Sequence, residues 1–426
     1  MSWPPLKELL TGALALGLVV IGWPHVRPEP VSTHGRITTS IVFNREVSQI
    51  FQKKCFQCHT DGNVSMALTT YREARPWAVA IKEEILEKRM PPWSAVTGYG
   101  HFSNDVSLTA REVSLILSWA DGGAPSGVLM ADEDKPAVIV PSLSGWEHGQ
   151  PNAVVAVAAS EKVAADSPDR TARIEVATGL KQAQWLKSMQ LNFGDRRVVR
   201  YAAVYELRTG QWLGTWTPTH QVSALPAGVA IQLPAGGKVA VEIGYRGTAE
   251  AASGAGELGF YFSADKPAQV AAPLEISAAP VTVAAGKSRE RVRTEFTLKS
   301  ATTAAALWPS LGAGATSVEV TAIRPDGVVE PLLWLKDYRT DWPSSYVFKE
   351  PVTLPAGTRL IVTAYYDNAG ATPLRAQPSL SVTAFPPRLR VATARQARPG
   401  DATARQARLR DATARQASRP PAPLAP

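Results

Sequence analysis

The chain has 426 residues, 45% of them hydrophobic and 19% charged, which is ordinary for a globular protein with room for two or three domains. Its formal net charge of +8 is concentrated at one end, because residues 387–426 hold nine arginines and two aspartates and so carry seven of the eight charges. The rest of the chain is nearly neutral, so composition gives no support for a basic field that would attract nucleic acid.

Residues 1–30 predict an export signal. Lys7 precedes the uncharged run Leu9–Trp23, whose 15 residues suit a signal sequence and fall short of the roughly 20 needed to cross a bilayer. No small-residue cleavage site follows at residues 24–27, so the segment is expected to be either a signal peptide or a retained N-terminal anchor. Both predict a periplasmic or other extracytoplasmic location, the second on the cytoplasmic membrane; a buried N-terminal helix is the alternative.

Residues 39–127 predict a small α-helical domain. Asn44 is a candidate cap for a first helix, Pro76 suits the first turn of a second, and Thr109 with Glu112 forms a capping-box pair before a third. Gly122 and its neighbour then end that helix. The acidic, proline-containing residues 126–141 read as a linker.

Beyond the linker the pattern changes to β. Apolar and other residues alternate in 239–245, and the turn string L-P-A-G occurs at 225–228, 233–236 and 354–357. We therefore predict a multidomain chain, α then all-β, with two antiparallel, jelly-roll-like β-sandwiches at 142–267 and 268–386. The tail, 387–426, repeats A-T-A-R-Q-A and predicts a disordered segment, with a basic tether as the alternative role.

The motif C-x-x-C-H is the strongest signal in the chain. It reads Cys55-Phe56-Gln57-Cys58-His59 and uses both of the protein's cysteines. Two thiols at i and i+3 share one side of a turn, where they can form thioethers to the two vinyl groups of a haem, and the next residue can offer its imidazole to the iron. A thioredoxin-type pair expects a βαβ setting and a zinc site needs four ligands, so neither fits this pattern.

The second axial ligand must come from elsewhere. Met90 in K-R-M-P-P-W is the preferred candidate, because Pro91 and Pro92 restrict the loop that presents its thioether. Met66 competes, but its apolar neighbours favour a core position, and His101 lies among glycine and polar residues typical of a surface loop. The tryptophans Trp77, Trp93 and Trp119 are expected in a haem pocket or in the core, which the sequence does not separate.

Residues 41–125 resemble the cytochrome c-like domain of secreted bacterial proteins. The matching strings are V-F-N-R-E-V, C-F-Q-C-H, L-T-T-Y-R-E-A-R-P-W-A, R-M-P-P-W, F-S-N-D and S-W-A-D-G-G-A-P. The resemblance implies a covalently bound haem c on Cys55 and Cys58, with His59 and Met90 as iron ligands.

The β region resembles the copper type II, ascorbate-dependent monooxygenase pair of sandwiches, similar to peptidylglycine hydroxylating monooxygenase. The matching strings are R-R-V-V-R-Y-A-A-V-Y, L-P-A-G-V-A-I-Q-L-P-A-G-G-K, R-P-D-G-V-V-E-P-L-L and T-L-P-A-G-T-R-L-I-V-T-A-Y-Y-D-N. Where the family has histidine ligands, this chain has Arg200 and Tyr201, Gly244, and Ser310 and Gly312 within P-S-L-G; the family's late Met ligand has no counterpart. Most of these side chains cannot bind copper, so copper is not expected and the sandwiches read as a degenerate form of the module.

The leading hypothesis is an electron-transfer protein rather than an enzyme, with no catalytic residue assigned. One haem would exchange single electrons with a redox partner protein or a membrane electron-transport chain, and the sandwiches would act as a docking or scaffold module. The alternatives are a haem-coupled copper monooxygenase and a binding or structural protein with an accessory haem. The third would use a ligand surface of sandwich tryptophans, although such residues more often lie in cores: Trp212, Trp216, Trp308, Trp334 and Trp342.

Overall fold

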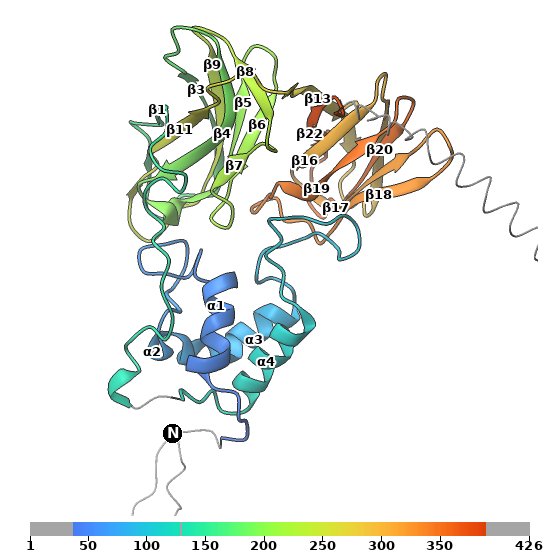
Figure 1. The fold of residues 1–426 in the computed structure, drawn as a ribbon. Helices are drawn as coiled ribbons and strands as arrows, with labels where there is room; N and C mark the ends of the chain where they lie inside the picture. The colour runs from blue at the N-terminus through green and yellow to red at the C-terminus, as the bar shows by residue number, and fades with distance from the viewer. Residues whose placement is uncertain (1–36, 128–129, 389–426) are drawn as a thin grey trace, which may run out of the picture.

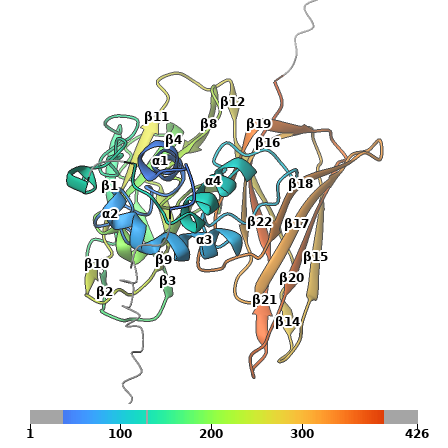
Figure 2. The same ribbon diagram turned by 90° about the horizontal axis from the view of Figure 1, so that it is seen from below.

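The computed structural model describes residues 37–127 and 130–388, so the N-terminal export segment and the repeats of the tail lie outside the described residues. Most of the regular secondary structure in the described chain is β-strand, arranged in several sheets, and the α-helices all precede the first strand. Figure 1 shows the helical part below two β-sandwiches that stand side by side. From below, the helices lie against the end of the first sandwich, with the second sandwich to one side (Figure 2).

Within residues 37–127, the helical part contains four α-helices and two further helical turns of other geometry. They are η1 (Phe43–Val47), α1 (Ser48–Lys54), α2 (Tyr71–Ala74), η2 (Arg75–Trp77), α3 (Ala78–Leu86) and α4 (Ala110–Asp121). The predicted capping box at α4 is confirmed: the Thr109 side chain accepts from Glu112 N, and the Glu112 carboxylate accepts from Thr109 N. A second box, Thr70 with Glu73, begins α2. Asn44 does not cap the first helix, because it lies inside η1, which begins with Phe43.

The core of the helical part is aromatic. Phe43, Phe51 and Trp119 pack within 6.3 Å of one another, measured between ring centroids, and all three are buried. The predicted linker, residues 126–141, packs partly against this core. Val138 and Val140 pack against it, and the carbonyl of Ile139 accepts a hydrogen bond from Gln52 Nε2 at 2.7 Å. Short helices follow at η3 (Met130–Asp132) and, within the β region, η4 (Arg196–Val198).

The first sandwich has two main sheets that share one core. One sheet has the order β1 (Ala153–Val157), β11 (Gly256–Phe262), β4 (Gln184–Phe193), β8 (Val229–Leu233) and β12 (Gln269–Val270), with β7 (Val222–Ala224) paired to β4. The other is β3 (Arg170–Ala177), β9 (Lys238–Tyr245), β5 (Val199–Glu206) and β6 (Trp212–Trp216). A two-stranded ribbon joins β2 (Lys162–Val163) to β10 (Ala252–Ser253). Because β12 pairs with β8, this sandwich extends to Val270, a few residues past the predicted division.

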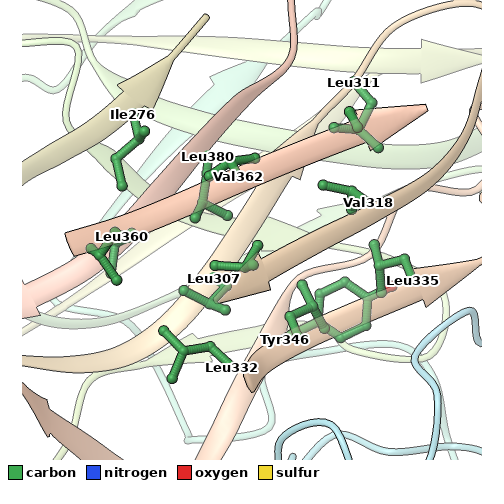
Figure 3. Packing of buried hydrophobic residues seen from close by; sticks show 14 of the residues in the cluster. Ile276, Leu307, Leu311, Val318, Leu332, Leu335, Tyr346, Leu360, Val362 and Leu380 are labelled. Atoms are coloured by element: carbon green, nitrogen blue, oxygen red, sulfur yellow. The ribbon is translucent and has the colours of Figure 1, made fainter. Parts of the chain in front are cut away.

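The second sandwich repeats this arrangement. One sheet is β13 (Ala272–Ser277), β22 (Ser379–Phe385), β16 (Thr302–Ser310) and β19 (Tyr346–Leu354). The facing sheet is β15 (Glu290–Thr297), β20 (Arg359–Tyr366), β17 (Ala315–Ile323) and β18 (Val329–Lys336), and β14 (Val281–Val283) pairs with β21 (Leu374–Ala376). Leu307, Val318 and Val362 are among the side chains that fill the space between the sheets (Figure 3).

The predicted alternation of 239–245 is only half right. Val239, Val241, Ile243 and Tyr245 are buried as expected, but Ala240 and Gly244 on the other face of β9 are buried too. The reason is the neighbouring sandwich. Ala203 and Trp212 on β5 and β6 pack on Ala306 and Trp308 of β16, so this sheet has protein on both faces.

The helical part also contacts the second sandwich. The segment between α3 and α4 (Figure 1) forms isolated bridges to it through Ala95 with Leu335 and Phe102 with Phe348. Phe102 belongs to the core of the second sandwich, and Trp93 packs against that core. Residues far apart in sequence therefore join the helical part to the second sandwich.

Candidate functional site

The C-x-x-C-H motif forms one tight turn directly after α1. Cys55 is the C-terminal cap of that helix, and its carbonyl accepts hydrogen bonds from Cys58 N at 3.0 Å and His59 N at 2.9 Å. The Cys55 carbonyl oxygen therefore fixes the backbone of both Cys58 and His59. The turn brings the three predicted residues Cys55, Cys58 and His59 together within one turn of chain.

The imidazole of His59 is oriented by its backbone surroundings. Its Nδ1 lies 3.0 Å from the carbonyl oxygen of Met66, and since a carbonyl only accepts, Nδ1 carries the proton. Burial lowers the pKa of His59 below its usual value, so the ring is neutral near pH 7. The Nε2 atom, for which the described residues provide no hydrogen-bond partner, is therefore the basic nitrogen.

The two cysteines are free thiols. Burial raises the pKa of the Cys58 thiol to about 12, and burial, with Cys58 as a further cause, does the same for Cys55. Both are neutral near pH 7, which makes them poor nucleophiles by themselves. Two thiols and one free imidazole nitrogen on the same turn are a donor set that fits a haem attached through both sulfurs.

Met90 lies in the segment that follows α3, and its backbone N donates to the carbonyl of Glu84 at 3.2 Å. Its side chain is 37% exposed and makes no described hydrogen bond to the C-x-x-C-H turn. Met90 thus lies outside the core of the helical part, and the structure shows no hydrogen bond between it and His59. The interpretation of Met66 as a core residue is wrong: it is 38% exposed, and the Ser65 hydroxyl donates to its sulfur.

The other aromatic candidates of the helical part separate clearly. Trp119 is fully buried in its core, whereas Trp77 is exposed. Trp93 packs on Phe102 and Tyr346, so it belongs with the second sandwich. His101 is exposed, as expected, and its carbonyl accepts from Lys349 N of that sandwich.

Arg196 holds the motif turn against the first sandwich, which sequence reasoning missed. Its buried guanidinium donates to the carbonyls of Gln57 at 3.4 Å, Pro218 at 3.1 Å and Leu143 at 3.2 Å. It also lies over the ring of Trp216, 5.4 Å from the centroid. Burial lowers the pKa of Arg196, yet the group stays charged. Its place in the R-R-V-V string was the only available signal.

The positions where the monooxygenase resemblance expects copper ligands meet in one cavity. Arg200 and Tyr201 on β5, Gly244 on β9, and residues 309–312 at the end of β16 all line a pocket of about 580 Å³ between the two sandwiches. Tyr201 and Gly244 are cross-strand partners. Arg and Gly supply no ligand atom from their side chains, so the residues present do not fit a multi-histidine copper site.

The sandwich tryptophans are mostly interface or core. Trp212, Trp216 and Trp308 are buried; Trp308 donates to the Tyr205 hydroxyl at 2.8 Å and stacks on Trp212. Trp334 packs edge-on against Tyr99, and Trp342 lies beneath Arg200. The five tryptophans therefore do not form the broad ligand surface considered from the sequence. What remains of that surface is the wall of the cavity between the two sandwiches.

Within residues 37–127 and 130–388, no cluster of three or more His, Cys, Asp or Glu side chains is arranged to hold a metal ion. In the same part of the chain, no helix has the length and apolar character required to span a membrane.

No protein-family model and no curated protein sequence matches the chain. Among solved structures, PNGase F, a glycosylasparaginase from Flavobacterium meningosepticum, is 13% identical, with 54% of this chain and 96% of that chain covered and a TM-score of 0.27. The major capsid protein P2 of bacteriophage PM2 is 12% identical, with 55% and 97% covered and a TM-score of 0.22. PNGF-II is 9% identical, with 54% and 65% covered and a TM-score of 0.24. Similarities this distant carry no argument about activity.

Proposed function

We propose that the chain is an exported mono-haem c-type cytochrome that transfers single electrons outside the cytoplasm. Cys55 and Cys58 would hold the haem through thioethers, and His59 and Met90 would be the axial ligands. The haem would supply reversible one-electron transfer at its iron. The sandwiches would position the haem-binding turn and dock a redox partner protein or a component of a membrane electron-transport chain.

The observation that carries this proposal is the state of His59. Its Nδ1 proton is committed to the Met66 carbonyl at 3.0 Å, and its Nε2 is unprotonated and free. When one ring nitrogen of a histidine donates a hydrogen bond in this way, it fixes the tautomer and the ring orientation with which the other nitrogen binds a metal. Two free thiols lie on the same turn, and Arg196 keeps that turn in place from the first sandwich.

The haem proposal is tested by the intact mass and the absorbance spectrum of the purified protein. The full chain is produced in a host that has haem-attachment machinery, and the intact mass, the reduced-minus-oxidised spectrum and the iron and copper contents are measured. We expect the added mass of one haem, a low-spin c-type spectrum, one iron and no stoichiometric copper. The double variant Cys55→Ala, Cys58→Ala should lack the added mass.

The matched control is Met66→Ala, which alters an exposed residue of the same loop but keeps both cysteines, so the added mass of one haem should remain. An unmodified wild-type mass from a competent host would refute the haem proposal. Copper at one equivalent or more, with ascorbate-dependent oxygen uptake, would favour the monooxygenase alternative.

A further inference from the structure

The cavity between the two sandwiches contains an unpaired buried charge. Its volume of about 580 Å³ is in the range of small-molecule pockets. Arg200 lines it and is only 8% exposed. Among the described residues its guanidinium has one partner, the ring of Trp342, 5.4 Å from the centroid, and no hydrogen bond or ion pair.

An arginine in this state calls for an anion. A buried guanidinium with five N–H donors is stabilised by an anion that pairs with it, because pairing offsets the loss of bulk hydration. Burial lowers the pKa of Arg200 to about 10, which still leaves it charged near pH 7. A carboxylate matches the planar fork of the guanidinium with two parallel hydrogen bonds.

The acidic groups around the cavity do not fill this role. Asp341 forms a salt bridge to Arg339 at 2.7 Å and attracts Arg200 only at a distance, and Glu242 accepts from the Tyr201 hydroxyl at 3.2 Å. Asp169 is exposed and attracts Arg200 only at a distance. The other lining arginine, Arg170, is paired with Glu161. Arg200 is thus the group in this wall that has no counter-ion in contact.

The rest of the wall is aromatic. The rings of Tyr201 and Trp308 lie 6.3 Å apart, centroid to centroid, and Tyr245 and Tyr338 also line the cavity. Such rings pack well on a flat, apolar body. The rings carry no positive charge, so Arg200 is the group in this wall that would pair with a carboxylate.

We propose that this cavity binds a small organic anion with a planar body, whose carboxylate pairs with Arg200 and whose body packs on the half-buried rings of Tyr201 and Tyr338. The site goes beyond electron transfer and does not depend on a haem. It gives the sandwiches a ligand-binding role at the positions where the resembling family holds copper.

The experiment is a calorimetric titration of the full chain with benzoate and with benzamide, its neutral counterpart of the same shape. We expect benzoate to bind one site per chain and at least roughly tenfold more tightly than benzamide, because only the carboxylate forms charge-assisted bonds. Arg200→Gln should weaken benzoate by a similar factor and leave benzamide nearly unchanged. Arg197→Gln, at a half-buried arginine paired with Asp195, is the matched control and should bind as wild type.

Equal binding of benzoate and benzamide, binding of neither, or an unchanged Arg200→Gln variant would overturn the proposal. If Arg200→Gln fails to fold, Arg200→Lys keeps the charge, and the preference of the wild type for benzoate remains decisive. The titration is run on haem-loaded protein and on the Cys55→Ala, Cys58→Ala variant. Binding restricted to the latter would mean that a haem propionate takes the place of the anion, which also overturns the proposal, whereas haem attachment is judged separately by mass.

Discussion

Tyr201 on β5 and Gly244 on β9 are direct cross-strand partners, and a Cβ atom added to Gly244 would lie 2.3 Å from Cε1 of the Tyr201 ring. The tyrosine ring therefore covers the strand where the glycine leaves room for it. The Tyr201 ring can lie there because position 244 has no Cβ atom.

This pairing predicts a coupled effect on stability. Gly244→Ala should lower the free energy of unfolding by about 1–3 kcal/mol, because the ring and the strand must separate. In a Tyr201→Ala background the same change should cost clearly less, as measured by urea unfolding in a double-mutant cycle. Gly194→Ala, which meets no atom closer than 4.0 Å, is the control. Equal costs of Gly244→Ala in both backgrounds would contradict the coupling.

Removing the Arg196 guanidinium should loosen the motif turn. Arg196→Met loses three hydrogen bonds to carbonyls on three separate segments and should reduce the free energy of unfolding by about 2–3 kcal/mol. Arg197→Met breaks only a partly exposed salt bridge and should cost about 1 kcal/mol or less. Denaturant titrations of both variants provide the comparison; similar losses would show that Arg196 is not the stronger anchor.

Met90 and Met66 should differ when the chain carries haem. Met90→Ala is expected to change the stability of haem-free protein by no more than about 0.5 kcal/mol, because the side chain is well exposed. In haem-loaded protein the same change should turn the low-spin absorbance spectrum into a high-spin one. Met66→Ala should leave that spectrum unchanged, and the reverse result would transfer the ligand role to Met66.

His220 should make the protein sensitive to acid. Burial lowers its pKa to about 4, while in the unfolded chain the value is near 6.5. Between these two values the unfolded chain binds a proton that the folded chain does not, so stability should fall as pH drops from 6.5 towards 4 and then level off for this group. His220→Gln should flatten thermal stability over that window relative to wild type. His101→Gln, an exposed control, should keep the wild-type slope; if both variants behave alike, another group is responsible.

Local features of this fold were predictable. The capping box of Thr109 with Glu112 and the L-P-A-G turns are encoded in neighbouring residues, and the turns appear with Gly228, Gly236 and Gly357 at positive φ. The closeness of Cys55, Cys58 and His59 follows from spacing alone. Their assignment to a haem remains a proposal.

Long-range features were not predictable. Arg196 meets Gln57 across 139 residues of sequence, and no periodic pattern records that contact. Met66 looked like a core residue because its neighbours are apolar, yet a loop can expose one apolar side chain among buried ones. The convergence of Arg200 with Ser310 required the two sandwiches to be placed together.

The segment that carries Trp93 and Phe102 has a consequence for dissection of the protein. Phe102 sits in the core of the second sandwich, although the entire first sandwich separates the two in the chain. A fragment ending near residue 125 would leave these aromatic rings exposed to water, and a fragment beginning after it would lack part of its interior. Cutting the polypeptide between its apparent domains would therefore destabilise both fragments. Experiments on isolated parts should keep the segment with Trp93 and Phe102 together with the second sandwich.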